Sequence, residues 1–183
     1  ANGIWNLFYM PLLAAIFFTC SLAECNRAPF DLAEAEQELV GGYHTEYSSM
    51  KFALFFMGEY IHMVTACAFF SMMFLGGWDL PFLKEPLVGG IGLALLKFSV
   101  FAGKVTFLLA LMMLIRWTIP RFRFDQLMRL AWRSLIPVTL TLLLLTALIQ
   151  TMNWPMWSYL IANVATVILI LIRSEERRVG KEC

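Results

Sequence analysis

The sequence predicts an all-α fold, a polytopic transmembrane helix bundle with about five membrane-spanning helices. Hydrophobic residues make up 60% of the 183 residues and the mean hydropathy is +0.72, whereas water-soluble domains are about half apolar. Five apolar runs reach the length of about 20 residues that spans a hydrocarbon core. All six Trp residues lie at or near the ends of these runs, where an indole ring suits the membrane interface. The predicted spans are residues 4–23, 52–75, 91–115, 131–149 and 154–172.

The first span leads into a polar loop, residues 24–51. Pro29 interrupts any helix that continues out of the membrane. Asp31 then occupies an N-cap position, and Glu34 follows three residues later as in a capping box. A short helix over 32–40 is therefore predicted, and these two acids have a structural explanation as helix caps.

Most of the acidic residues in this loop have no such explanation. Neighbouring carboxylates repel one another, and an ordinary solvated loop would intersperse Lys and Arg among them. Crowded carboxylates beside a low-dielectric region are expected to have raised, coupled pKa values and to exchange protons near neutral pH. The acids are Glu24, Asp31, Glu34, Glu36, Glu38 and Glu46, and the flanking bases are Arg27 and Lys51.

Ionisable residues also occur inside the second and third spans. Glu59 is followed three residues later by His62, on the same helical face. Lys104 is near the middle of the third span, and Lys97 is close enough to its end to reach the interface. Because a charge at membrane depth costs several kcal/mol unless it is paired or hydrated, Glu59 and Lys104 are functional candidates; a purely structural ion pair is the alternative.

The segment 116–133, before the fourth span, is a basic loop. By the positive-inside rule this loop is cytoplasmic, and two crossings earlier the acidic loop is then cytoplasmic too. Its basic residues are Arg116, Arg121, Arg123, Arg129 and Arg133.

The last segment, 173–183, changes abruptly to charged residues without apolar periodicity. Codons for this tail can be written so that they begin with a common short-read sequencing adapter. We therefore expect a sequencing artefact and not native protein. A basic juxtamembrane tail facing an anionic leaflet is the alternative, and the underlying nucleotide sequence distinguishes the two.

Cofactor motifs are not found. Cys20, Cys25 and Cys67 have neither CxxC spacing nor neighbouring His ligands, and nothing resembles a P-loop, GxGxxG or HExxH motif. We expect this chain to bind no metal, flavin or iron–sulfur cluster. The pair Gly76 and Gly77 is interpreted as loop or helix-end glycines only.

Two long motifs carry a family resemblance. The run AECNRAPFDLAEAEQELVGGYHTEYSSMKFALFFMGEYIHM resembles the signature of one membrane subunit of respiratory complex I, designated H in bacteria and numbered 1 in mitochondria. A second run, IPRFRFDQLMRLAWRSLIPVTL, resembles that family's next cytoplasmic loop and following helix. The resemblance extends over nearly all of residues 1–150. Since the family begins with several further helices, the sequence is expected to be a fragment of about the C-terminal half.

The resemblance implies a role at the junction of the membrane and peripheral arms of NADH:quinone oxidoreductase. The acidic loop would help form the quinone chamber and the start of the proton path, Glu59 and Lys104 would be the family's buried glutamate and lysine, and the second loop would contact the peripheral arm. The chamber and proton-path residues are then Glu24, Arg27, Asp31, Glu34, Glu36, Glu38, Glu46, Glu59 and Lys104, and the arm-contact residues are Arg121, Arg123 and Asp125.

The resemblance also implies partners and chemistry. Quinone would be the substrate, reduced by an iron–sulfur cluster bound to a neighbouring protein of the complex, and this chain would not be catalytic alone. The partners would be peripheral-arm quinone-site subunits, antiporter-like membrane subunits and the lipid bilayer, with no nucleic acid. The bacterial inner membrane is expected in preference to the mitochondrial one.

Three alternatives stay open. A membrane subunit of an energy-converting hydrogenase shares this ancestry but passes electrons to protons without quinone. A stand-alone ion transporter would be purified alone, and the absence of an inverted repeat argues against it. A scaffold would use the loop acids only as docking contacts.

Overall fold

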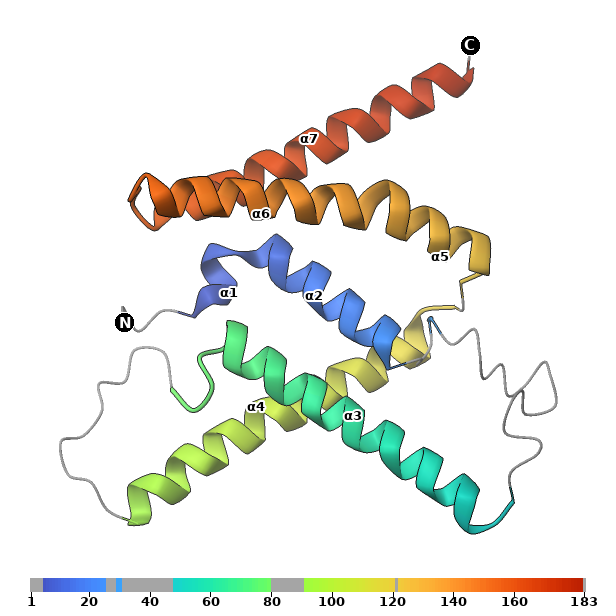
Figure 1. The fold of residues 1–183 in the computed structure, drawn as a ribbon, viewed down its shortest axis with the longest axis vertical. Helices are drawn as coiled ribbons and strands as arrows, with labels where there is room; N and C mark the ends of the chain where they lie inside the picture. The colour runs from blue at the N-terminus through green and yellow to red at the C-terminus, as the bar shows by residue number, and fades with distance from the viewer. Residues whose placement is uncertain (1–4, 26–28, 31–47, 80–90, 121, 183) are drawn as a thin grey trace.

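The computed structural model describes residues 5–25, 29–30, 48–79, 91–120 and 122–182, and for 171–182 the backbone only. These residues form helices and connecting turns, with no strand in the described ranges, so the predicted all-α fold is confirmed. In chain order the elements are α1 (Asn6–Tyr9), α2 (Pro11–Glu24), α3 (Met50–Phe74), α4 (Ile91–Thr118), α5 (Phe124–Leu130), the π-helix η2 (Ala131–Leu135), α6 (Ile136–Thr151) and α7 (Trp157–Glu182) (Figure 1).

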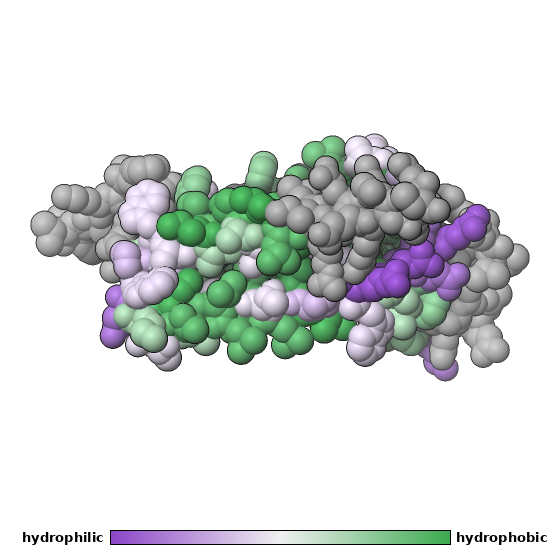
Figure 2. Space-filling model, turned by 90° about the horizontal axis from the view of Figure 1, so that it is seen from above, coloured by the Kyte–Doolittle hydropathy of each residue, from purple (hydrophilic) through white to green (hydrophobic). Residues whose placement is uncertain are grey.

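Among the described residues, three helical stretches are long and apolar enough to cross a membrane: Met50–Phe74, Ile91–Thr118 and Phe124–Thr151. Only 11% of the residues in the most apolar window of each are buried, so most of their apolar side chains face outward. Figure 2 shows hydrophobic residues across the middle of the molecule and hydrophilic ones gathered toward its ends. An outward-facing apolar band fits a lipid environment, and the chain is a multi-pass membrane protein.

The first predicted span is broken in the structure. α1 and α2 are separated at Met10, whose φ of −131° and ψ of 58° are not helical. Pro11 then starts α2, a position that suits proline because the first helical residue needs no amide donor. Both Pro11–Glu24 and the apolar part of α7, Trp157–Ile170, are shorter than the other three apolar helices. A total of five crossings therefore stays a prediction.

The helix that contains the fourth predicted span starts earlier than the span itself. α5, η2 and α6 follow one another without a break from Phe124 to Thr151, and α4 extends to Thr118, so most of the predicted basic loop is helical. Pro137 offers no amide hydrogen and its ring crowds the carbonyl of Arg133. A wider π-helical turn, Ala131–Leu135, lies at this place and accommodates the proline without ending the helix.

The core lies between α2, α3 and α4, and Figure 1 shows α3 and α4 crossing. The ring of Phe17 on α2 lies 6.1 Å from the ring of Phe70 and 5.7 Å from that of Phe74, both on α3. Cys67 is fully buried, with its Sγ 3.6 Å from the sulfur of Met112 on α4. Aromatic and sulfur contacts of this kind hold helices together where lipid supplies no hydrophobic driving force.

α6 and α7 form a second layer. The turn between them contains Asn153 with φ of 50°, a conformation that Asn tolerates better than most residues. α7 also packs on the first helices, where the ring of Trp157 meets the ring of Tyr9 edge-on at 6.4 Å. Asn163 is fully buried in this layer and donates to the carbonyl of Tyr159 at 2.7 Å.

Replacing Phe70 with Ala should destabilise the protein by about 3 kcal/mol, because the ring packs against Phe17, Phe18 and Phe74 and its removal leaves a cavity. Thermal unfolding of the full protein in detergent measures the change. The control is Phe107→Ala on α4, whose side chain is 67% exposed. Equal losses in the two variants would show that this aromatic cluster is not a stabilising core.

Candidate functional site

Lys104, in the middle of α4, caps the C-terminal end of α3. Its Nζ donates to the carbonyl oxygens of Leu75 at 2.8 Å, Gly77 at 2.8 Å and Asp79 at 2.6 Å. An ammonium group has three N–H donors, so all of them are used by backbone carbonyls. The cation predicted at membrane depth is therefore hydrogen-bonded in full.

Two glycines give this turn its shape. Gly76 and Gly77 have φ of +68° and +59°, in the left-handed region that side chains disfavour. The amide of Gly77 donates to the carbonyl of Ser71 at 3.0 Å, and that of Asp79 to the carbonyl of Gly76 at 3.1 Å. The turn leaves the carbonyls of Leu75, Gly77 and Asp79 for the lysine. The sequence indicates only a loop or helix-end role for the glycine pair, and gives no sign that this turn binds the ammonium group of a lysine.

The N-terminal segment completes the lysine site. The Nζ of Lys104 lies 4.9 Å from the centre of the Trp5 ring, within range of a cation–π interaction. Asn6 donates its side-chain amide to the carbonyl of Met73 at 3.0 Å, which ties the same segment to the last turn of α3. The C-terminal end of a helix carries partial negative charge, so a cation is favoured there. Lys104 thus joins α3, α4 and the start of the chain.

A second group of ionisable residues lies where α2 meets α3. Glu24, the last residue of α2, places Oε1 3.9 Å from Nε2 of His62. The side chains are 72% and 44% exposed, so the pair contributes little to stability. Glu59 precedes His62 by about one helical turn and is half-buried, with its Oε1 atom buried. The row Glu24, His62, Glu59 leads from the loop end of α2 into the side of α3.

This row was only partly predictable. Glu59 and His62 share a face by spacing alone, but this spacing indicates no role for His62. The approach of Glu24 depends on how α2 packs against α3, which periodicity does not determine. The row begins at Glu24, the first residue of the predicted acidic loop.

The two predicted cytoplasmic loops meet at one end of the bundle. The amide of Phe122 donates to the carbonyl of Pro29 at 3.0 Å, and the rings of Phe30 and Phe122 stack at 5.6 Å. Pro29 and Phe30 are buried. The beginning of the acidic loop is therefore fixed against the segment that starts α5.

Two predicted arm-contact residues are exposed beside this junction. Arg123 precedes α5, and its amide donates to Oε1 of Gln126 at 3.2 Å, while Asp125 is in the first turn of α5. Both side chains are exposed and can meet another surface. Seven predicted site residues lie outside the described residues: Arg27, Asp31, Glu34, Glu36, Glu38, Glu46 and Arg121.

The parts of the chain that the structure describes contain no group of three His, Cys, Asp or Glu residues placed to hold a metal ion. Cys20, Cys25 and Cys67 form no disulfide with one another. The arrangement is suited to holding and exchanging protons, through carboxylates and an imidazole, and to fixing one positive charge.

Comparison with known proteins decides the family. The NADH dehydrogenase family model matches residues 1–147. The chain belongs to the family of NADH-quinone oxidoreductase H subunits. The H 1 subunit of NADH-quinone oxidoreductase from Geobacter sulfurreducens is 49% identical over 154 residues, which cover 84% of this chain and 41% of that protein.

Other relatives agree with this membership. The H 1 subunit of NADH-quinone oxidoreductase from Cytophaga hutchinsonii is 46% identical over 78% of this chain and 42% of its own length. NADH-quinone oxidoreductase subunit 8 of Rhodothermus marinus is 46% identical over 79% of this chain and 44% of its own length. The chain thus spans about two fifths of the length of the curated relatives it matches.

Replacing Lys104 with Met should loosen the turn after α3, because three carbonyls lose a charged donor while the length of the side chain is nearly kept. Loss of about 2 kcal/mol of local stability corresponds to about 30-fold faster exchange of the amides of Gly77 and Asp79. Hydrogen–deuterium exchange of the assembled membrane complex measures this.

The matched control is Lys51→Met, at the other end of α3, which should leave these amides unchanged. Exchange as slow in the Lys104 variant as in the wild type would show that the lysine does not hold the turn.

Proposed function

We propose that this chain is part of the membrane subunit of proton-translocating NADH:quinone oxidoreductase that joins the membrane and peripheral arms. In this role it helps form the quinone chamber and couples quinone reduction to proton translocation. Its membership of the H-subunit family carries the proposal, and the row Glu24, His62, Glu59 supplies groups suited to moving protons.

The proposed chemistry divides between subunits. Electrons reach quinone from an iron–sulfur cluster in a neighbouring protein of the complex, and this chain supplies chamber wall, protons and charge. Reduction of quinone creates negative charge that favours protonation of nearby carboxylates, Glu34, Glu36 and Glu38 among them. Because these acids belong to the same loop as Glu24, a change in their charge alters the electrostatic potential at Glu24, the first member of the row.

From Glu24 the signal has a short path to the side of α3. Oε1 of Glu24 lies 3.9 Å from Nε2 of His62, and Glu59 lies about one turn before His62 on the same face of α3, nearer the start of the helix. An imidazole between two carboxylates can accept a proton on one side and release one on the other. The half-buried position of Glu59 makes its charge sensitive to its surroundings, as expected for a group that couples distant sites.

Lys104 has a different part in this proposal. Its three donors are bound to carbonyls, so it has no free lone pair with which to accept a proton in this state. Lys104 therefore acts as a fixed positive charge. Its field shifts the protonation of ionisable groups on the path toward the antiporter-like partners. Handing its own proton to antiporter-like partners requires the turn at Gly76 and Gly77 to open first.

Docking of the peripheral arm is assigned to the junction of the two loops. The contact of Phe122 with Pro29 and Phe30 fixes the base of the acidic loop. The exposed Arg123 and Asp125 stand beside it with opposite charges, which suits a polar interface with another subunit. Movement of the arm would thereby reach the acidic loop.

Replacing Glu59 with Gln in the assembled complex should reduce NADH-driven proton pumping to about a tenth, because the row loses its half-buried carboxyl group. Proton uptake and quinone reduction are measured together in vesicles, and Glu36→Gln should act in the same direction. The matched control is Glu85→Gln, which lies between the second and third predicted spans and hence on the opposite side of the membrane from the acidic loop. Wild-type pumping in both the Glu59 and Glu36 variants would refute the coupling role.

The substrate distinguishes the proposed function from the hydrogenase alternative. The purified wild-type complex should reduce a water-soluble quinone with NADH and evolve no hydrogen. Hydrogen evolution without quinone reduction would overturn the proposed function, whatever the Glu59 variant does.

A further inference from the structure

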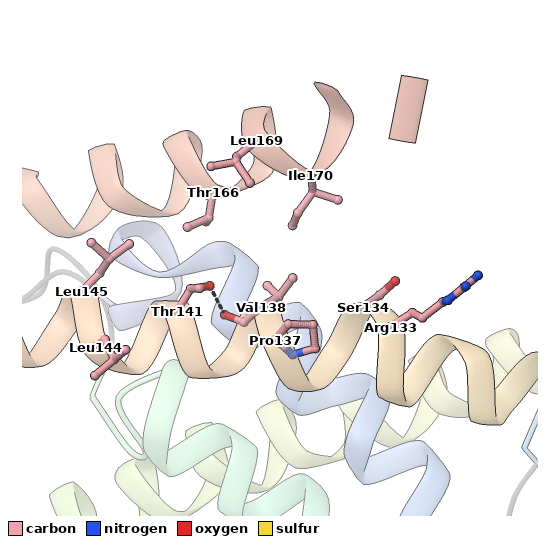
Figure 3. Close-up of a pocket in the computed structure, with 10 residues that line it drawn as sticks. All are labelled: Arg133, Ser134, Pro137, Val138, Thr141, Leu144, Leu145, Thr166, Leu169 and Ile170. Atoms are coloured by element: carbon pink, nitrogen blue, oxygen red, sulfur yellow. Dashed lines mark hydrogen bonds between the residues drawn. The ribbon is translucent and has the colours of Figure 1, made fainter. Parts of the chain in front are cut away.

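A groove lies between α6 and α7, with a volume of about 560 Å³ (Figure 3). This volume is in the range of about 300–1,000 Å³ typical of small-ligand sites. One wall runs from Arg133 on η2 to Leu145 on α6, and the other belongs to α7, where Thr166, Leu169 and Ile170 line the groove. The α7 wall lies beyond the residues that match the family model.

The walls of the groove are apolar along almost the whole length. The two threonines in it use their hydroxyl protons within their own helices: Thr141 donates to the carbonyl of Val138 at 2.8 Å and Thr166 to that of Asn163 at 2.7 Å. Neither threonine therefore offers a free hydroxyl proton to the groove. Such a surface suits a hydrocarbon chain and does not suit a polar ligand.

The groove is one leaflet deep. From Ser134 to Leu145 a helix rises by about 16 Å at about 1.5 Å per residue. Half of a hydrocarbon core is about 15 Å thick. The groove thus runs from the membrane interface to about the middle of the bilayer, the depth that one acyl chain of one leaflet occupies.

The mouth of the groove is basic. Figure 3 shows Arg133 and Ser134 at one end, away from Leu144 and Leu145. Arg133 is exposed, and the neighbouring Trp132 is 66% exposed, as expected for a residue at the membrane interface. A guanidinium fork binds a phosphate through two parallel hydrogen bonds. Charge at the mouth and hydrocarbon below it match an anionic lipid.

We propose that this groove binds one acyl chain of an anionic phospholipid of the cytoplasmic leaflet, with the lipid phosphate on Arg133. The π-helical turn that contains Arg133 and Ser134 places the cation and a hydroxyl together at the interface. The lipid fills the space between α6 and α7 and holds the second layer of the bundle. The site does not depend on which reaction the complex performs.

The test uses the assembled complex, reconstituted in nanodiscs with equal amounts of phosphatidylglycerol and phosphatidylcholine. After mild delipidation, native mass spectrometry counts the lipids that remain bound. Wild-type protein should retain phosphatidylglycerol, and Arg133→Gln should bind it about tenfold more weakly, since a charge-assisted pair is lost. Arg129→Gln is the matched control, a neighbouring basic residue that does not line the groove, and should retain the lipid.

A second variant tests the hydrocarbon part. Thr141→Trp fills the middle of the groove and should displace the lipid even though Arg133 is intact. Equal retention of the two lipids by the wild type would overturn the proposal without recourse to any variant. Retention unchanged in both variants, or cross-linking of a protein helix or of quinone into the groove, would overturn it as well.

Discussion

The hydrogen bonds between Lys104 and the end of α3 satisfy two demands that a bilayer makes at once. Water is scarce inside a bilayer, so the last carbonyls of a helix and an ammonium group each cost free energy there when they lack a hydrogen-bond partner. The turn built by Gly76 and Gly77 brings the carbonyls of Leu75, Gly77 and Asp79 onto one nitrogen. α3 and α4 are thereby joined at a point where apolar packing alone gives little specificity.

The other ionisable groups of the site are held less firmly than Lys104, and this contrast is the main property of the site. Lys104 is fixed by three hydrogen bonds, whereas Glu24 and His62 are 3.9 Å apart and largely exposed. A fixed charge sets the local potential, and loosely held groups respond to it. In the proposed function the row Glu24, His62, Glu59 changes its protonation while Lys104 provides constant bias. The contact of Phe122 with Pro29 places the base of the acidic loop at the same end as the segment that starts α5.

The structural features that depend only on a short stretch of sequence could be predicted from the sequence. Apolar runs identified α3 and α4 to within a few residues, and the glycine pair marked a true helix end. Three features escaped because they depend on tertiary packing or on competition between residues. Met10 and Pro11 split an apolar run that hydropathy reads as continuous, the carbonyl site of Lys104 joins positions 25 to 29 residues apart, and His62 meets Glu24 across two helices. The quinone-chamber acids stay predictions from resemblance, because most of the loop lies outside the described residues.

Infrared difference spectroscopy of the assembled enzyme tests the central claim most directly. Spectra are recorded with quinone oxidised and then reduced, for the wild type and for Glu59→Gln. If the row responds to quinone, reduction changes a protonated-carboxyl band in the wild type, and that change is absent from the variant. Identical difference spectra for the two proteins would contradict the account, because Glu59 would then hold the same protonation state before and after quinone reduction.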